Sequence, residues 1–401
     1  MIGARLTGDV SAPQLTRMGL GSPGPCGTTT LTPVGETIID RRPYLQRMTT
    51  HSGMIVWTAP ATAGATVSIT TPDGAPVMRA EADVDATAPL AGGRAQMVAA
   101  LDGLSPATRY CYEIQSNGQP LLQGGTFVTA PLAGSGAKVS VVVLGDSGEG
   151  GSDQHALLRQ MQTLRHDLML HTGDIAYDSG TLADFESKFF DVYSSMLWSS
   201  PMFPTSGNHD YETADAAAYR QVFALPENGG AEGLERWYSF DWGDVHFVAL
   251  DTERIGDAQA RWLAADLVAN QLPWTVVYGH RPPHSTGEHG DTVAFKQFFV
   301  PIIEEHHVDL VLAGHDHNYE RFRPQNGVTY VVTGGGGRGT RGVSGGPLTA
   351  FAESVIHCIV VEVEGNKLSV HAIDGVGREF DSTVIQKAAA DTISRTPDSG
   401  E

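Results

Sequence analysis

The sequence predicts a small all-β sandwich followed by a larger α/β domain, which has a mixed sheet or two sheets inside flanking helices. Between residues 40 and 132, short alternating strands are separated by turn residues, with no helical pattern. From residue 138 to 386, β-branched apolar runs alternate with helical stretches instead. A small-residue segment at 130–138 has the composition of a linker between two domains.

Composition limits the partners that we expect. The length of 401 residues suits two or three domains of about 150 residues each. A formal net charge of −20 argues against nucleic acid and anionic membrane surfaces as partners, because both require a basic surface. No stretch approaches the ~18 to 20 apolar residues of a membrane span. The same charge would repel a phosphorylated substrate unless the site itself holds strong positive charge.

The cysteines and the two ends of the chain carry little structure by pattern. Cys26, Cys111 and Cys358 allow one disulfide at most. Residues 1–39 are rich in Gly, Pro, Thr and Ser, and we interpret them as an extended arm; residues 387–401 are expected to form a polar tail. The first residues lack an apolar core of signal-peptide length, although a removed leader would leave the same pattern. Localisation is therefore left open.

The sandwich is predicted from runs such as 53–58, 65–71 and 109–115, which alternate apolar and polar residues. The stretch LSPATRYCYEI, which contains Tyr110, resembles the corner before a late strand of a fibronectin type III domain. Trp57 would be the aromatic residue of its core. An unspecialised sandwich with a coincidental tyrosine pair is the alternative.

The α/β domain begins with an apolar run at 139–145 that hardly alternates, as expected of a strand buried on both faces. Helical stretches follow at 153–164 and 258–269, each between further apolar strands. Residues 237–251 are interpreted as an antiparallel hairpin that turns at 242–244. Beyond residue 327, strands dominate again.

Five apolar strands are each followed at once by a glycine and then by Asp, Asn or His. The motifs are GDSG with Asp146, GDIAY with Asp174 and Tyr177, GNHD with Asn208 and His209, GHRPPHSTGEH with His280, His284 and His289, and GHDH with His315 and His317. Ligand-binding groups of such sheets collect just past the carboxyl ends of the strands. Glycine permits a sharp turn there and a close approach of the backbone to a crowded centre.

These side chains are ligands of transition metals, since carboxylate and imidazole suit borderline ions and Asn and Tyr oxygens can complete a harder ion's shell. Several gaps between the leading residues are roughly 30 residues long, which is the length of one strand–helix–strand unit. Taken singly, each motif is more often a turn, a helix cap or a surface loop than a ligand. Five coincident motifs predict a metal centre.

The ordered set GDSG, GDIAY, GNHD, VYGH and GHDHNYER resembles the metallophosphoesterase pattern, and specifically that of the purple acid phosphatases. Tyr177 is the residue that singles out this branch. PYLQ at 43–46, ahead of the sandwich, and Tyr319 and Arg321 are also similar to that family. The resemblance covers nearly the whole chain beyond residue 40 and implies a four-layer αββα domain of the α/β (α+β) class.

The resemblance implies two metal ions about 3.5 to 4 Å apart, iron(III) with zinc, manganese or iron(II). Asp146, Tyr177 and His317 would hold the first ion, Asn208, His280 and His315 would hold the second, and Asp174 would bridge them. Residues two apart in an extended segment point to one side, so His315 and His317 can serve adjacent ions. A hydroxide bridging the ions would attack a phosphomonoester in line, which makes the chain an acid phosphatase.

Leaving-group assistance is expected from histidines near the ligands. His209 follows Asn208 directly, and His289 lies at a position similar to that of a substrate-binding histidine of the family; His284 is a further candidate. Two positions depart from the family pattern. Asp210 stands where members often carry Glu, and Gly290 follows His289, so the adjacent histidine pair of some members is missing.

Two other functions stay open. A phosphodiesterase or nucleotide hydrolase could use the same centre, because the same metals cleave either ester. A catalytically silent binding protein, with the sandwich mediating adhesion, is the more remote alternative, since all seven ligand positions are filled. The expected partner is a small phosphorylated substrate. The sandwich could shape the pocket rim or mediate formation of a homodimer.

The family that the chain resembles is commonly secreted or periplasmic.

Overall fold

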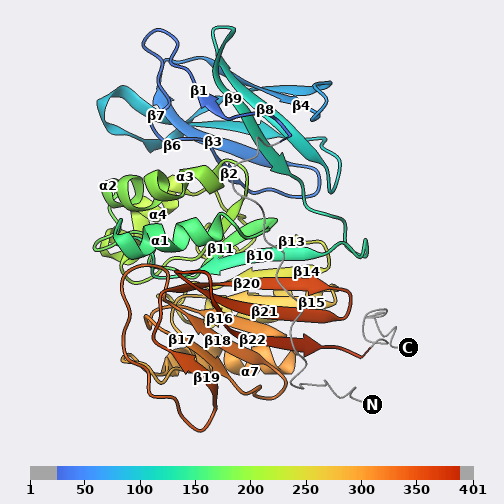
Figure 1. Ribbon diagram of the computed structural model, residues 1–401, viewed down its shortest axis with the longest axis vertical. Coiled ribbons are helices and arrows are strands. Elements are labelled where there is room, and N and C mark those ends of the chain that lie inside the picture. Colours follow the sequence, from blue (N-terminus) through green and yellow to red (C-terminus); the bar gives the residue numbers. More distant parts are fainter. Residues whose placement is uncertain (1–24, 389–401) are drawn as a thin grey trace.

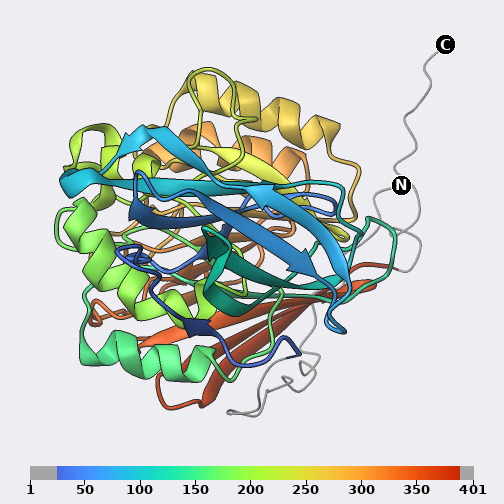
Figure 2. The same ribbon diagram turned by 90° about the horizontal axis from the view of Figure 1, so that it is seen from above.

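The computed structural model describes residues 25–388, and Figure 1 shows the β-sandwich at one end of the larger α/β domain. Seen from above in Figure 2, the sandwich strands cross over the α/β domain, whose helices lie at its margins. The predicted arm lies outside the described residues as far as residue 24, and the predicted tail does so from residue 389. No helix among the described residues is long and apolar enough to cross a membrane.

The sandwich consists of two antiparallel sheets. One has the order β1 (Thr30–Leu31), β9 (Gln119–Val128), β8 (Arg109–Ser116), β4 (Ala65–Thr70) and β5 (Pro76–Glu81), and the other has β2 (Tyr44–Gln46), β3 (Gly53–Pro60), β7 (Arg94–Leu101) and β6 (Asp83–Pro89). Along β8 every second residue is buried, which is the alternation of a strand with one face on a core. The predicted all-β region is confirmed.

The core of the sandwich contains Trp57, as predicted, with no exposed surface. The hydroxyl of Tyr110 accepts a hydrogen bond from the backbone N–H of Ser105 at 2.9 Å, so the tyrosine closes a corner a few residues upstream of its own position. A fibronectin type III identity for this sandwich stays a prediction.

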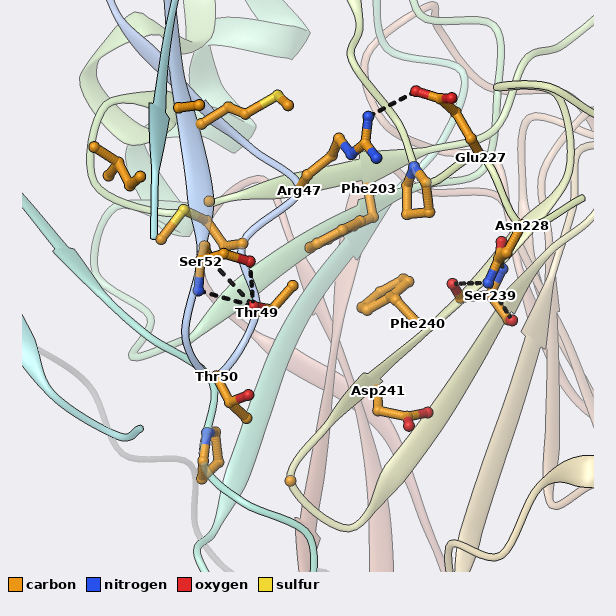
Figure 3. A pocket seen from close by; sticks show the side chains of 18 of the residues that line it. Arg47, Thr49, Thr50, Ser52, Phe203, Glu227, Asn228, Ser239, Phe240 and Asp241 are labelled. Carbon is orange, nitrogen blue, oxygen red and sulfur yellow. Dashed lines mark hydrogen bonds and ion pairs between the residues drawn. The ribbon is translucent and has the colours of Figure 1, made fainter. Parts of the chain in front are cut away.

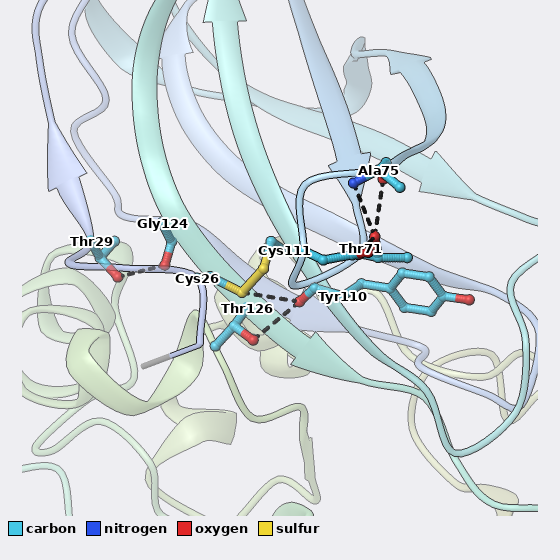
Figure 4. Close-up of a disulfide and its surroundings, with 9 residues drawn as sticks. Cys26, Thr29, Thr71, Ala75, Tyr110, Cys111, Gly124 and Thr126 are labelled. Atoms are coloured by element: carbon cyan, nitrogen blue, oxygen red, sulfur yellow. Dashed lines mark hydrogen bonds between the residues drawn. A yellow bond between two sulfur atoms is a disulfide. The ribbon is translucent and has the colours of Figure 1, made fainter. Parts of the chain in front are cut away.

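The sandwich begins earlier in the chain than the predicted boundary at residue 40. β1 pairs with β9, and a disulfide joins Cys26 to Cys111 in β8 (Figure 4). Closing a loop between two residues 85 positions apart removes chain entropy from the unfolded state, an effect on the order of 4 kcal/mol. Part of the expected arm therefore belongs to the sandwich. The disulfide attaches residue 26 to β8, and β1 adds a strand to the edge of the sheet at β9.

The PYLQ segment fastens the sandwich to the α/β domain. Its three residues in β2 are all buried, and the Tyr44 hydroxyl donates to the carbonyl of Val222 at 2.5 Å. The Arg41 guanidinium is bonded to the Glu186 carboxylate, with Nε 3.0 Å from Oε1. These contacts are buried or partly buried and join residues far apart in sequence, so they hold the two domains in one orientation.

A cavity of about 800 Å³ lies where the two domains meet (Figure 3). Phe203 and Phe240 stack at its wall with their ring centroids 3.8 Å apart. On the sandwich side Arg47 forms an ion pair with Glu227, with Nη1 and Oε1 2.8 Å apart. The domains therefore touch through β2 and leave a solvent space beside it.

Two mixed sheets form the centre of the α/β domain. One has the order β12 (Met202–Pro204), β11 (Leu168–His171), β10 (Val139–Leu144), β20 (His357–Glu364), β21 (Lys367–Asp374) and β22 (Glu379–Gln386), and the other has β13 (Tyr238–Trp242), β14 (Val245–Ala249), β15 (Trp274–Tyr278), β16 (Leu310–Ala313), β18 (Thr329–Thr333), β17 (Tyr319–Phe322) and β19 (Thr349–Glu353). β10, β11 and β12 run parallel, as do β14, β15, β16 and β18.

Helices cover the outer faces of the two sheets. They are α1 (Ser152–Met161), α2 (Leu182–Phe185), α3 (Asp191–Leu197), α4 (Ala217–Val222), α5 (Asp257–Ala269), α6 (Val293–Phe298) and α7 (Val300–Glu305). In β15, Val276 and Tyr278 belong to the large core between the sheets, whereas Val277 packs with Leu263 of α5 and Phe295 of α6. Strands buried on both faces read as continuous apolar runs, which is why these strands hardly alternate in sequence.

The predicted hairpin at 237–251 is formed by β13 and β14, with Trp242 opposite Val245. His246 in β14 fastens this hairpin: Nδ1 lies 2.7 Å from Oδ1 of Asp241, and Nε2 lies 2.8 Å from Oδ2 of Asp266 in α5. Burial lowers the pKa of His246, but the two carboxylates outweigh it and raise the pKa to about 9. The prediction that His246 is structural agrees with these contacts.

Replacing His246 by glutamine is expected to destabilise the fold in a pH-dependent way. Because the pKa is higher in the folded chain, the stabilisation is present below pH ~6.5 and is lost as the pH rises through about 9. We expect a loss of about 2 to 3 kcal/mol at pH 6, reduced because Asp241 is exposed, and a much smaller loss at pH 10. Urea unfolding at both pH values measures it, and an equal loss at both would contradict the charge argument.

Candidate metal centre

The predicted ligand residues all follow the carboxyl ends of strands, and the structure brings them together. Asp146 follows β10, Asp174 follows β11, Asn208 follows β12, His280 follows β15, and His315 and His317 follow β16. Ligand atoms of Asp146, Asp174 and His280 all lie within 4.8 Å of one another. Both sheets therefore deliver their strand ends to one buried place.

The backbone is strained where these strands end. Asp146, Asp174 and His315 have φ values of 57°, 54° and 70°, in the left-handed region that residues with a Cβ rarely adopt. Such conformations cost on the order of 1 to 3 kcal/mol each and persist where the surrounding structure fixes them. Three of the seven candidate ligands thus have a strained backbone.

Four atoms that could bind a metal form a first set, which consists of the Tyr177 hydroxyl oxygen and three atoms around it. This oxygen lies 3.1 Å from Oδ1 of Asp146, 2.9 Å from Oδ2 of Asp174 and 3.1 Å from Nε2 of His317. Nε2 of His317 is 3.5 Å from Oδ1 of Asp146. The set holds two carboxylates, a phenol and one imidazole.

A second set surrounds Nε2 of His280. This nitrogen lies 3.1 Å from Oδ1 of Asn208, 3.2 Å from Nδ1 of His315 and 3.4 Å from Oδ2 of Asp174. Asp174 Oδ2 therefore belongs to both sets. The second set is richer in nitrogen and carries fewer negative charges than the first.

The residues fit two metal ions. Donor atoms about 2.0 to 2.2 Å from one ion lie roughly 3.0 to 3.5 Å from each other, which matches the separations in both sets. Nδ1 of His280 is 3.0 Å from the carbonyl of Thr172 and donates to it, so Nε2 is the atom that would bind an ion beside the amide oxygen of Asn208. A bound ion would take the place of the proton on Nε2.

The charges favour a cation at the same place. Burial lowers the pKa of His280, but the carboxylates of Asp174 and Asp146 outweigh it and raise the pKa to about 10. Burial and the same two carboxylates raise the pKa of Tyr177 well above its usual value. The potential that binds these protons equally attracts metal ions, which would displace them.

Glycine is required at two of the turns because the backbone approaches the ligands closely. A Cβ on Gly207 would lie 2.2 Å from Oδ1 of Asp174, and one on Gly314 would lie 2.4 Å from Oδ2 of Asp146. Both distances are far inside van der Waals contact. The repeated glycine of the strand-end motifs thus makes room for the carboxylates.

Asp210, the residue after His209, fastens two of the ligand loops to each other. Its buried carboxylate accepts hydrogen bonds from the backbone N–H of Ile175 at 3.1 Å and of Gly207 at 2.8 Å. Burial, and next the charge of Asp174, raise the pKa of Asp210 to about 7. An aspartate here holds both loops, so the departure from the family's usual glutamate keeps a carboxylate in place.

His209 lies beside the first set. Its backbone N–H donates to Oδ1 of Asp174 at 2.9 Å, and its ring packs against Tyr177 with the centroids 4.4 Å apart and the planes tilted by 53°. Nδ1 is 2.5 Å from the carbonyl of Asp178 and donates to it. Nε2 lies 4.0 Å from Oδ2 of Asp174, and the residue lines a cavity together with Tyr177 and His317.

His289 lies beside the second set, stacked on His315 with the centroids 4.2 Å apart. Its backbone N–H donates to the buried carboxylate of Asp316 at 3.0 Å, and Nη1 of Arg341 donates to its Nε2. Burial and the positive charge of Arg341 lower the pKa of His289, although Asp316 opposes them. The ring is therefore held neutral.

His284 is not brought to the centre. It packs against Phe322 and Tyr330, with ring centroids 5.7 Å and 4.9 Å away, and its charged neighbours are Lys296 and Asp291. Its position in the loop places it on the side of the sheet that faces α6. The structure thus separates it from the other two candidate histidines.

Sequence reasoning missed the arginines at the mouth of the centre. Arg338 and Arg341 line a cavity of about 240 Å³ together with Tyr177, His209 and His317. They come from the loop after β18, whose glycine run reads as a plain turn. Among the described residues, none from the sandwich lines this cavity.

Residues 139–319 match the model of the calcineurin-like phosphoesterase family. The uncharacterized protein Rv2577 of Mycobacterium tuberculosis is 31% identical over 166 residues, a match that covers 35% of this chain and 31% of that protein. Purple acid phosphatase 17 of Arabidopsis thaliana is 27% identical over 246 residues, covering 52% of this chain and 72% of that protein. The chain thus matches less than a third of the first relative.

Among solved structures, the purple acid phosphatase PPD1 from yellow lupin seeds superimposes with a TM-score of 0.76 and 19% identity. The match covers 88% of this chain and 75% of that one. At this identity the likeness establishes the fold. The predicted metallophosphoesterase fold, preceded by an all-β region, is confirmed.

Proposed function

We propose that this chain is a phosphatase that hydrolyses small phosphomonoesters at a centre of two metal ions. The observation that carries the proposal is the pair of donor sets that share Oδ2 of Asp174. Two ions with a common ligand are the arrangement of many enzymes that displace a group at phosphorus. The match of residues 139–319 to the calcineurin-like phosphoesterase family supports the same reaction class.

The two donor sets suit different ions. The phenol and two carboxylates around Tyr177 are hard oxygen donors, which favour iron(III). The two imidazoles and the amide oxygen around His280 suit zinc, manganese or iron(II). When bound, such ions supply a nucleophile from water near neutral pH and neutralise phosphoryl oxygens.

The side chains of the chain itself orient the substrate and handle the proton. The Asp178 carbonyl accepts the Nδ1 proton and fixes the His209 ring, so the imidazolium form carries its second proton on Nε2 and can pass that proton to a leaving alkoxide in the cavity that His209 lines. His289 accepts from Arg341 and is kept neutral, so it suits orientation of Arg341 better than donation of a proton. We therefore assign leaving-group protonation to His209 and a positioning role to His289. His284 receives no role.

A phosphodiesterase or nucleotide hydrolase on the same centre is the second candidate. Its support is the chemistry of the donor sets, which does not by itself distinguish a monoester from a diester. The small cavity favours monoesters, because about 240 Å³ is less than the roughly 300 to 1,000 Å³ of sites for drug-sized ligands. A silent binding protein would not need three strained ligand residues.

Phosphate release from a panel of monoesters and matched diesters tests the proposal. The protein is stripped with a chelator and then reloaded with iron and zinc. We expect monoester turnover by the loaded protein, none by the stripped protein, and a loss of at least about 100-fold in Asp146→Asn. Preferred cleavage of diesters would favour the second candidate. No turnover of either class with both metals bound would overturn the assignment.

A further inference from the structure

The cavity at the candidate metal centre is lined by Arg338 and Arg341, which belong to neither set of candidate metal ligands. The cavity of about 240 Å³ is bounded on one side by Tyr177, His209 and His317, and on the other by the segment 338–341. This segment belongs to the glycine-rich loop between β18 and β19. It brings two arginines to the same cavity as the candidate proton donor.

The loop is fastened to the ligand residues themselves. The backbone N–H of Arg338 donates to the carbonyl of Asp146 at 3.0 Å, and that of Arg341 donates to the carbonyl of His317 at 2.8 Å. Each arginine therefore starts from a backbone position fixed relative to a candidate metal ligand. These two hydrogen bonds hold the arginine backbone in place although the loop contains several glycines.

The charge of Arg338 is largely compensated. Its Nη1 lies 2.5 Å from Oε1 of Glu149, its Nη2 lies 2.8 Å from Oδ1 of Asp178, and its Cζ sits 5.1 Å from the Tyr177 ring centroid. Because two carboxylates already bind its guanidinium, Arg338 adds little net positive charge to the cavity and acts mainly as an oriented hydrogen-bond donor.

The charge of Arg341 is only partly compensated, because one carboxylate lies beside it. Its Nη1 donates to the ring of His289 and, at 3.3 Å, to the carbonyl of His315. The carboxylate beside it, that of Glu288, is 3.6 Å from Nε. Within residues 25–388, Nη2 of Arg341 makes no hydrogen bond, and the side chain is 31% exposed. An oriented, charged donor therefore remains available at the cavity wall.

We infer that Arg341, oriented by His289 and supported by Arg338, binds a second anionic group of the substrate next to the phosphate that is cleaved. The inference rests on the proposed function and narrows its substrate class. A planar guanidinium with free N–H donors recognises phosphate and carboxylate oxygens alike. In a chain of formal net charge −20, a fixed cation at the mouth is also what a multiply charged anion requires.

The preferred substrates are then small phosphate esters or anhydrides that carry a phosphate or carboxylate close to the scissile phosphate. For pyrophosphate, the bridging P–O bond breaks, water supplies the new oxygen, and two orthophosphates with the two protons of water result. The cavity volume limits the substituent to a small group, and a larger one would extend into solvent.

The test compares phenyl phosphate with 2-carboxyphenyl phosphate, which adds a carboxylate, and with pyrophosphate, which adds a phosphate. The variants are Arg341→Gln, Arg341→Lys and, as a control for loss of one positive charge, Arg79→Gln in β5, an exposed residue of the sandwich. We expect Arg341→Gln to lower the kcat/KM ratio of a second-anion substrate to phenyl phosphate by about 10- to 100-fold. Arg341→Lys should restore part of the ratio, and Arg79→Gln should leave it unchanged.

An equal fall on all substrates would overturn the inference, because Arg341 would then act on the scissile phosphate or on the fold. Calorimetric binding of pyrophosphate and orthophosphate to the metal-loaded protein gives a readout without turnover. Arg341→Gln should reduce the pyrophosphate-to-orthophosphate affinity ratio by about 10-fold or more, and an unchanged ratio would overturn the inference. If the wild type hydrolyses none of the esters, the proposed function fails, while this ratio still decides the inference.

Discussion

Asp174→Asn is expected to lower the affinity for both metals by more than about 100-fold. Phosphate release should fall by a similar factor, because it depends on the bound metals. Oδ2 of Asp174 lies 2.9 Å from the Tyr177 hydroxyl and 3.4 Å from Nε2 of His280, so one carboxylate serves both donor sets. An amide carries no negative charge and cannot bridge two cations. Loss of an outer-shell partner alone costs about 10- to 100-fold in affinity, and a shared ligand should cost more.

Competition with a chromophoric chelator measures the affinities of this variant for zinc and iron. Asp102→Asn, at an exposed turn of the sandwich, is the matched control and should bind metal like the wild type. Near-ultraviolet circular dichroism establishes that the variant is folded. Wild-type metal affinity in a folded Asp174→Asn protein would remove Asp174 from the centre.

His209→Gln is expected to lower turnover according to the leaving group. If Nε2 of His209 protonates the departing oxygen, an alkyl phosphate such as glycerol phosphate should lose about 100- to 10,000-fold in kcat. 4-Nitrophenyl phosphate, whose leaving group departs without a proton, should lose far less. Steady-state kinetics on both substrates measures the difference.

The matched control for this variant is His155→Gln, which replaces an exposed histidine of α1. It should change neither substrate. An equal loss on both esters in His209→Gln would mean that His209 binds the phosphate and does not protonate the leaving group. Unchanged turnover of the alkyl ester would exclude both roles.

The positions of the candidate ligands could be predicted from sequence because each is local to a strand end. Glycine followed at once by Asp146, Asp174, Asn208 or His280 needs only the position of the preceding apolar run. The parallel strands then carry these residues to one edge without further information. Periodicity therefore predicted that these side chains meet, whereas the grouping of their atoms into two sets required the coordinates.

Other features depend on contacts that periodicity does not carry. β1 could not be predicted, because a strand of two residues shows no periodicity and its partner β9 lies about 90 positions away. Arg341 lies far along the chain from His289, and only the packing of two loops joins them. His284 shares a loop with His289, yet the loop turns its ring toward Tyr330. Composition could not separate these cases.

We propose that seven side chains hold two metal ions around the shared carboxylate of Asp174. Anomalous X-ray diffraction from crystals of the metal-loaded protein, recorded at the iron and zinc edges, tests it most directly. We expect two peaks, one among the Tyr177 set and one among the His280 set, with Asp174 between them. A single peak, or peaks away from these side chains, would contradict it.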